Sequence, residues 1–141
     1  MIMRIINAEN LIIGRMATYV AKRLLLGESI VIVNCEKAVF TGSKKTVFEK
    51  FKQRRERGNA LKGPYYPRRP DMIVKRIIRG MLPYKQEKGK NAFKKLKCYV
   101  SIPEKYSGKN LESIDNAKIE KSNAEKYVDL LTISKQLGAK I

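Results

Sequence analysis

The sequence predicts an α/β protein that begins with a strand, a helix and a second strand. Residues 4–7 are a short apolar strand candidate, a helical pattern runs from Gly14 to Leu26, and residues 30–34 read I-V-I-V-N. A continuous apolar, β-branched run is typical of a strand that is covered on both faces. A strand, a helix and a strand within so few residues predict a right-handed βαβ unit with parallel strands.

The first predicted helix separates its apolar and polar side chains. On a helical wheel the apolar residues fall in one arc, and Arg15, Thr18, Tyr19 and Lys22 fall in the opposite arc. We therefore expect one face to be buried, and we expect Gly27 to end the helix. The expected buried residues are Met16, Ala17, Val20, Ala21 and Leu24.

A third short strand is predicted at residues 38–41, and a turn then leads into a second helix. This helix runs from Lys44 to about Arg57, with Ser43 as its N-cap. Cations crowd its second half, so we expect its far end to leave the core. The apolar side chains that anchor the helix are Val47, Phe48 and Phe51.

Residues 58–70 hold two glycines and three prolines, which exclude a helix or a central strand and predict a long loop. A third helix, residues 71–82, follows, because Pro70 suits a first helical turn and Asp71 complements the positive end of the helix dipole. Its apolar and cationic residues lie on separate sides. The apolar side holds Ile73, Val74, Ile77, Ile78, Met81 and Leu82, all assigned to the core, and the cationic side holds Lys75, Arg76 and Arg79.

The rest of the chain is harder to interpret. Pro83 ends the third helix, and residues 88–95 can form another short helix. Residues 98–103 are the last clear strand candidate. Beyond them the acids and bases nearly balance, and periodicity is weak until a short helix at residues 129–137. We expect a single domain over residues 1–141, with a mixed-charge extension at 104–141.

Positive charge is concentrated in one part of the chain. The window from Lys44 to Lys97 holds 19 of the 31 basic residues and 4 of the 13 acidic residues, a net charge of +15 out of +18. Solubility requires only a modest charge spread over the surface. The concentration therefore indicates binding to a polyanion.

The sequence offers little support for an enzyme or a metalloprotein. It has no histidine, and its two cysteines, Cys35 and Cys98, lie far apart in the chain, so we expect neither a disulfide framework nor a metal motif. The segment 41–46 lacks the glycine and lysine spacing of a phosphate-binding P-loop. No catalytic, cofactor-binding or metal-binding residue is predicted, and no cofactor is expected. The longest apolar run, residues 30–33, is too short to span a membrane.

Nucleic-acid binding explains the charge better, and RNA better than DNA. Tyr65 and Tyr66 stand beside Arg68 and Arg69 in the proline-rich loop, where rings and guanidinium groups suit unpaired RNA bases. Packing of the two tyrosines against their own prolines explains the pattern equally well. No helix-turn-helix, zinc finger or basic zipper points to DNA.

Three sequence blocks resemble the universal large-subunit ribosomal protein thirteen family. The first is G-R-M-A with V-A-K, from Gly14 to Lys22; the second joins V-I-V-N at residues 31–34 to Thr41-Gly42; the third is R-G-M-L-P, at residues 79–83, with Gly89 and Leu96. The segments G-P-Y-Y-P-R-R-P-D and R-G-M-L-P-Y-K are similar to the archaeal and eukaryotic branch. The resemblance implies a three-layer α/β/α fold with a short, mostly parallel four-stranded sheet, basic loops and a C-terminal extension.

The same resemblance implies a structural, non-enzymatic constituent of the large ribosomal subunit, bound to ribosomal RNA and neighbouring ribosomal proteins in the cytoplasm. It assigns RNA contacts to Arg79, Lys85, Lys88, Lys90, Lys94 and Lys95. It also implies that Gly80 permits close approach of the backbone, either to RNA or to a packed helix. From charge and loop character we add as RNA-binding candidates Lys44, Lys45, Arg54, Arg55, Arg57, Lys62, Tyr65, Tyr66, Arg68, Arg69, Lys75 and Arg76.

Two other functions remain open on sequence grounds. One is a small α/β enzyme acting on nucleotides or RNA, which only the parallel-sheet start and its glycine turns favour. The other is a free-standing RNA-binding regulator of translation that uses the same basic surface. Neither a membrane nor DNA is an expected partner.

Overall fold

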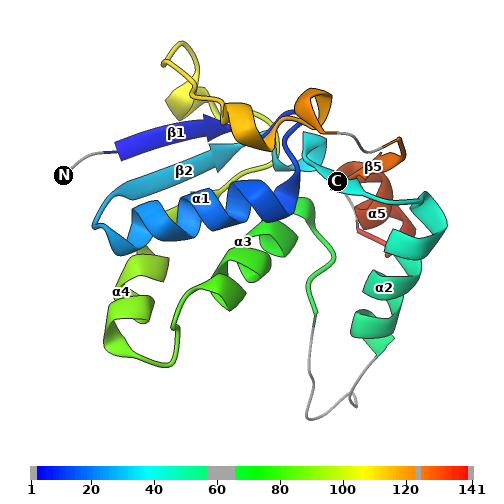
Figure 1. Ribbon diagram of the computed structural model, residues 1–141. Helices are drawn as coiled ribbons and strands as arrows, with labels where there is room; N and C mark the ends of the chain where they lie inside the picture. The colour runs from blue at the N-terminus through cyan, green and yellow to red at the C-terminus, as the bar shows by residue number, and fades with distance from the viewer. Residues whose placement is uncertain (1–2, 57–65, 123–124, 140–141) are drawn as a thin grey trace.

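The computed structural model describes residues 3–56, 66–122 and 125–139 (Figure 1). Three predicted RNA-binding residues lie outside these described ranges: Arg57, Lys62 and Tyr65. The order of elements is β1 (Met3–Asn7), α1 (Ile13–Leu25), β2 (Ser29–Val33), η1 (Cys35–Lys37), β3 (Val39–Thr41), α2 (Lys44–Glu56), α3 (Pro70–Met81), α4 (Glu87–Lys94), β4 (Leu96–Cys98), η2 (Glu104–Tyr106), η3 (Asp115–Ala117), η4 (Ile119–Lys121), β5 (Tyr127–Asp129) and α5 (Leu130–Gln136), where η marks a 3₁₀ helix.

The predicted α/β class and the parallel βαβ start are confirmed. The strands β1, β2 and β4 form a parallel sheet with β2 in the centre, and Arg4 lies opposite Ile30, which in turn lies opposite Leu96. The strands β3 and β5 form a separate antiparallel pair. The strands are thus divided between two sheets of three and two strands, rather than joined in one sheet of four.

The chain leaves the parallel sheet directly after β2. Asn34 has a left-handed backbone conformation with a φ of 57°, and the 3₁₀ helix η1 follows it. This turn carries β3 away from the sheet, where it meets β5 from the far end of the chain. Figure 1 shows β5, α5 and α2 grouped at one end of the molecule.

Both faces of the parallel sheet are covered. Alternate strand residues, among them Ile6, Ile30 and Ile32, pack with α1 and α3 in the main core. Their neighbours Ile5, Val31 and Val33 face the other way and pack with Tyr106 of η2. The second covering layer is therefore an extended segment with 3₁₀ turns, which lies across the sheet opposite α1 (Figure 1).

The helix faces predicted from periodicity agree with the structure for α1 and largely for α3. All five residues expected to be buried on α1 are buried, and so are Ile73, Val74 and Ile78 of α3. Met81 was assigned to the core, but it is 43% exposed. It is the last residue of α3, and Leu82, which follows the helix, takes the buried place instead.

The strand predicted at residues 98–103 was wrong in its position. The strand β4 covers only Leu96–Cys98, and the chain then turns away with a φ of 58° at Ser101. The backbone N–H of Ser101 donates to the buried Glu36 carboxylate at 2.8 Å, which stabilises this turn. The strand β5 was not predicted, whereas the last helix was, and Asp129 caps it by accepting from the N–H of Thr132 at 3.1 Å.

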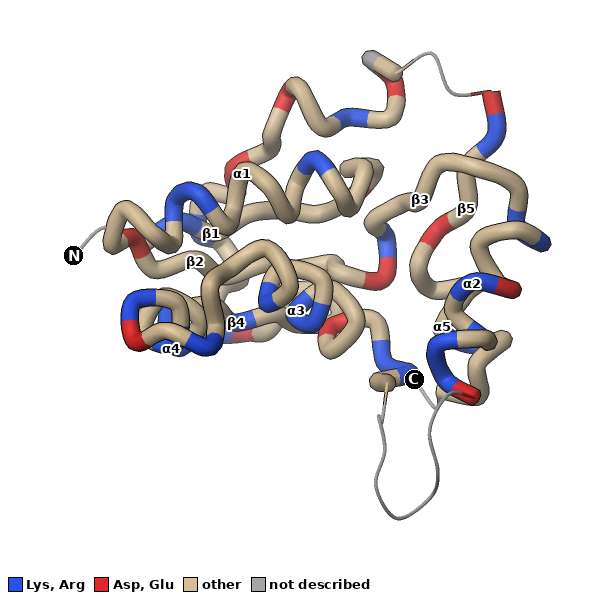
Figure 2. Tube along the Cα trace, turned by 60° about the horizontal axis from the view of Figure 1, so that its bottom comes forward, with Lys and Arg blue, Asp and Glu red and all other residues tan. Residues whose placement is uncertain are grey.

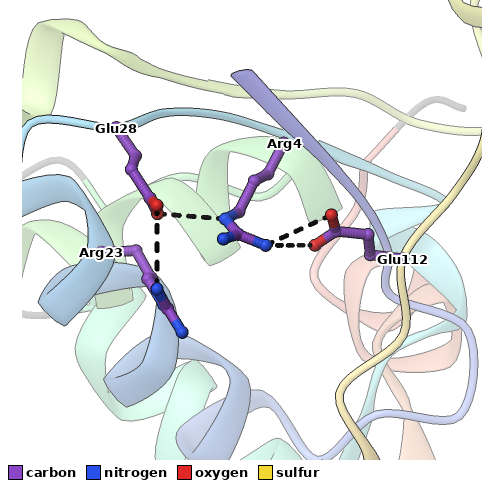
Figure 3. Close-up of polar contacts among 4 residues, drawn as sticks. All are labelled: Arg4, Arg23, Glu28 and Glu112. Atoms are coloured by element: carbon purple, nitrogen blue, oxygen red, sulfur yellow. Dashed lines mark hydrogen bonds and ion pairs between the residues drawn. The ribbon is translucent and has the colours of Figure 1, made fainter. Parts of the chain in front are cut away.

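The mixed-charge extension is tied to the sheet by an ion-pair network (Figure 3). Arg4 on β1 donates from Nε to Glu28 at 3.1 Å and from Nη1 to Glu112 of the extension at 3.1 and 3.3 Å. Arg23 of α1 lies 3.7 Å from the second oxygen of Glu28. Hydrogen bonds to Glu28 and Glu112 raise the pKa of Arg4 above its usual value. The network thus joins β1, the end of α1 with the turn that follows it, and the extension.

Candidate nucleic-acid interface

The cationic side of α3 is the centre of the candidate interface. Burial of the apolar side of this helix turns the opposite side outward. Each of its three cations lies against an aromatic ring. One ring belongs to the segment before α3, one to the turn after it and one to α4. The distances to the ring centroids are 5.2 Å for Lys75 Nζ and Phe93, 5.7 Å for Arg76 Cζ and Tyr66, and 4.7 Å for Arg79 Cζ and Tyr84.

The charge on this side of α3 is not neutralised by acids in the described part of the chain. The ion pairs found there involve Arg4, Arg23, Arg69 and Lys118. None of them reaches Lys75, Arg76 or Arg79. A cation–π contact of about 0.5–1 kcal/mol positions a cation without removing its charge. The aromatic rings therefore hold the α3 cations in place while leaving their charge available to an anion.

Tyr66 joins the end of α2 to the cationic side of α3. Its hydroxyl accepts from Arg54 Nη1 at 3.4 Å, and its carbonyl accepts from Arg55 Nη1. The guanidinium groups of Arg54 and Arg76 both lie 5.7 Å from its ring centroid, and the ring packs on Phe51 at 5.9 Å. Tyr66 thus packs against its own protein, and its ring, hydroxyl and carbonyl together contact three arginines from two helices.

The helix α4 adds a row of lysines beside α3 (Figure 2). Lys88, Lys90 and Lys94 of this helix are exposed, as is Lys85 in the preceding turn. Lys95 is half-buried, and its Nζ donates to the carbonyl of Gly27 at 3.5 Å. The helix α4 and the turn before it therefore add exposed positive charge near α3, and Lys95 also has a structural contact.

Gly89, rather than Gly80, permits a close approach of two backbone segments. A Cβ atom on Gly89 would lie 1.9 Å from the carbonyl oxygen of Pro83, so α4 packs directly on the R-G-M-L-P turn. A Cβ on Gly80 would have no heavy atom within 4 Å. Of the two explanations offered for Gly80, packing against a helix is not found among the described residues.

The remaining predicted residues are not all part of one surface. Arg68 and Arg69 are exposed just before α3, and Arg69 pairs with Asp71 at 3.5 Å. Lys44 and Lys45 are exposed at the start of α2, where Ser43 caps the helix by accepting from the N–H of Thr46 at 3.2 Å. Lys44 lines a different recess, which it shares with Lys37, Glu9 and Asp129.

A second group of lysines was missed by the sequence analysis. Lys97 and Lys105 join Lys94 and Lys95 in a recess of about 270 Å³ at the edge of the sheet, next to Tyr106. Lys105 and Lys109 each place Nζ 5.6 Å from the Tyr106 ring centroid. The nearly balanced charge of the extension concealed Lys105 and Lys109, whereas Lys97 is the last residue of the basic window. The available signal was the K-Y-x-x-K spacing, which places two lysines beside one tyrosine.

The two cysteines are neighbours in the fold, contrary to the expectation that no second thiol lies near either. Cys98 pairs with Ile32 across the sheet, and the N–H of Cys35 donates to the carbonyl of Tyr99 at 3.2 Å. A side-chain hydrogen bond with Cys98, together with burial, raises the pKa of Cys35 well above its usual value. Both thiols are free, and Cys35 is held in its unreactive neutral form.

The described residues contain neither a candidate metal site nor a candidate membrane span. They contain no group of three or more His, Cys, Asp or Glu residues that could hold a metal ion. None of their helices has the length and apolar character needed to cross a membrane. The unneutralised cations around α3 and α4 are therefore the strongest candidate site in this part of the chain.

Comparison with known proteins gives one consistent result. The family model described as Ribosomal protein L13 matches residues 2–105. Proteins named large ribosomal subunit protein uL13 are similar over most of their length. The Methanococcus maripaludis protein is 50% identical over 98% of this chain and 99% of its own length, the Methanococcoides burtonii protein 49% over the same shares, and the Archaeoglobus fulgidus protein 47% over 95% and 86%.

Proposed function

Because the chain belongs to the ribosomal protein L13 family, we propose that it is a structural constituent of the large ribosomal subunit that binds ribosomal RNA. The family consists of ribosomal proteins rather than enzymes, so the enzymatic alternative is set aside. Relatives named for the large subunit indicate association with that particle. We place the protein on the ribosome in the cytoplasm, in contact with RNA and neighbouring ribosomal proteins.

The observation that supports RNA binding most strongly is the set of α3 cations that have no acidic partner among the described residues. Lys75, Arg76 and Arg79 are held by aromatic rings, and Arg54 and Arg55 are held beside them through Tyr66. Side chains that are already positioned lose less conformational entropy when they bind. Guanidinium groups in fixed positions also match the paired oxygens of a phosphate.

The mechanism we propose is scaffolding of folded RNA. The apolar core fixes α2, α3 and α4 relative to one another, so their cations form a rigid surface that neutralises phosphates where RNA segments converge. Phosphate contacts position a protein without reading base sequence. Affinity should therefore depend on the number of ion contacts, and the protein should support subunit assembly by offsetting repulsion between RNA segments.

Binding to fragments of large-subunit RNA across a salt series tests this proposal. Five cations on phosphates predict a slope of log affinity against log salt of roughly −4. Replacing Arg76 or Arg79 by alanine should make the slope less steep by about one in each case, because each removes one phosphate contact. A matched control is Lys135→Ala on α5, an exposed lysine that is not one of the five cations. A flat slope for the unaltered protein would contradict the proposal.

Sedimentation separates a ribosomal constituent from a free-standing regulator of translation. A tagged chain should travel with the large subunit in a sucrose gradient, with little protein in the light fractions. The Arg76→Ala and Arg79→Ala double variant should shift toward the light fractions while its melting temperature stays nearly unchanged. A wild-type protein found mainly in the light fractions would favour the regulator instead.

A further inference from the structure

A recess of about 290 Å³ lies between α3, α4 and the stretch that leads into α3. It is lined by Pro67, Met72, Lys75, Arg76, Arg79 and Phe93. The lining combines two kinds of surface, because half of these residues are apolar and half are cationic. Few ligands match both: a suitable one has a flat apolar part joined to an anionic part.

The apolar part of the lining is open to a ligand. Met72 stands in the first turn of α3 and is 49% exposed, although it belongs to a helix whose other large apolar residues are mostly buried. Phe93 of α4 is half-buried, and its ring is in contact with Lys75. A thioether beside an aromatic ring forms a polarisable surface that adapts to flat partners. Such a surface suits a nucleobase.

The cationic part of the lining contains a donor that lacks an acceptor. The Nε of Arg79 is buried and has no hydrogen-bond partner among the described residues. Its guanidinium is held over the Tyr84 ring at 4.7 Å. Buried donors are nearly always satisfied in native structures, so an unsatisfied one calls for an explanation. Arg79 also lines the recess, so a phosphate bound there supplies an acceptor when the guanidinium turns toward it.

We propose that this recess binds one unpaired nucleotide of an RNA chain. The base lies against Met72 and Phe93, and the adjoining phosphate lies among Lys75, Arg76 and Arg79. A base within a helix must first unpair and unstack to enter a recess, which costs a few kcal/mol, whereas bases in bulges and loops are already unpaired. The inference rests on the proposed function, and it adds that the surface selects RNA at points where a base is extruded.

The first test uses three RNA hairpins that differ at one position: a bulged adenosine, an abasic residue at the same bulge, and a fully paired stem. Fluorescence anisotropy on the full-length protein should show about tenfold tighter binding to the bulged adenosine than to the abasic hairpin, from the stacking of one base. The salt slopes for these two RNAs should be equal, because their phosphates are the same. Equal affinity for all three hairpins would overturn the inference.

Methionine variants on α3 provide a matched pair for the same assay. Met72 and Met81 are both exposed, at 49% and 43%, but they lie on opposite sides of the helix. Met72→Ala should abolish the difference between the adenosine and abasic hairpins, whereas Met81→Ala should retain it. Arg79→Gln should weaken both RNAs and preserve their ratio. An unchanged ratio in Met72→Ala would place the base elsewhere and overturn the inference.

A second measurement requires no substitution in the recess. With ¹³C-labelled methionine methyl groups, titration of the unaltered protein with the bulged adenosine hairpin should shift the Met72 resonance, and the abasic hairpin should not. The Met81 resonance serves as the internal reference. Binding without a Met72 shift would overturn the recess site but leave the proposed function intact. Failure of every RNA to bind would instead refute the proposed function.

Discussion

Replacing Gly89 by alanine tests whether the R-G-M-L-P turn and α4 form one rigid unit. The added Cβ would lie 1.9 Å from the carbonyl oxygen of Pro83, 2.2 Å from its carbonyl carbon and 2.8 Å from the nitrogen of Tyr84. All three atoms belong to the backbone, so no side chain can rotate away. Ordinary contact begins at 3.4 Å, which requires a displacement of about 1.5 Å between α4 and the turn.

The expected loss of stability follows from two opposing terms. Overpacking of this size costs about 3 kcal/mol, at the upper end of the usual range, because the clash is with backbone. Alanine in a helix recovers about 1 kcal/mol relative to glycine. The net loss of about 2 kcal/mol should lower the melting temperature by roughly 6 °C for a chain of this length.

Gly80→Ala in the same block is the matched control. Gly80 is also helical, but a Cβ there meets nothing within 4 Å. This variant should gain about 0.5 kcal/mol from helix propensity and melt about 2 °C higher. Circular dichroism melts of the two variants beside the wild type give the comparison. If Gly89→Ala melts within about 2 °C of the wild type, the close packing of α4 on the turn is wrong.

Three further predictions concern the positioning of the arginines, the buried thiol and the extension. Tyr66→Ala should weaken RNA binding about fivefold at constant salt slope, because it removes two cation–π contacts. Tyr66→Phe keeps the ring and should weaken binding less than twofold. An equal loss in both variants would show that the hydroxyl matters and the ring does not. Because the pKa of the Cys35 thiol is raised in the folded protein, the thiol loses its proton at a lower pH in the unfolded chain than in the folded one. The contribution of the neutral thiol to stability is therefore complete below a pH of about 8.5 and declines above it. Denaturant titrations should therefore show a shallower decline of stability at alkaline pH in Cys35→Ala than in the wild type, and identical declines would contradict the assignment. Glu28→Gln should destabilise by about 1–3 kcal/mol and increase proteolysis of the extension, because it removes the negative charge and one of the two oxygens that Arg4 and Arg23 share at this mostly buried site. The exposed Glu120→Gln is the control, and equal proteolysis in both would show that the network does not hold the extension.

Local periodicity was sufficient to predict the first half of the fold. The buried face of α1 and the divided surface of α3 follow from the spacing of apolar residues, because a helix repeats every 3.6 residues whatever surrounds it. The apolar run of β2 likewise predicted a strand covered on both faces, and Ile32 and Val33 do pack on opposite sides. The error at Met81 arose at a helix end, where the wheel no longer determines burial.

Long-range pairing could not be predicted in this way. The pairing of β3 with β5 places Val39 opposite Asp129. A strand of three residues has too short a pattern of apolar and polar side chains for its partner strand to be predicted. The lysines of the extension that were not predicted show the same limit. The net charge along the chain does not tell which acidic residues form ion pairs with residues distant in sequence. Glu112 pairs with Arg4, and in the described part of the chain no ion pair reaches Lys105 or Lys109.

The amino-acid sequence by itself determined that this protein is a basic α/β member of a ribosomal family, since charge, helical period and the R-G-M-L-P block are all local properties. Only the tertiary structure decided how the charge is arranged. It placed Tyr66 between arginines of two helices, and it put Arg79, whose Nε has no acceptor in the described part of the chain, into the same recess as Met72. Such contacts depend on how segments that are distant in sequence pack against each other, and local sequence patterns do not determine that packing.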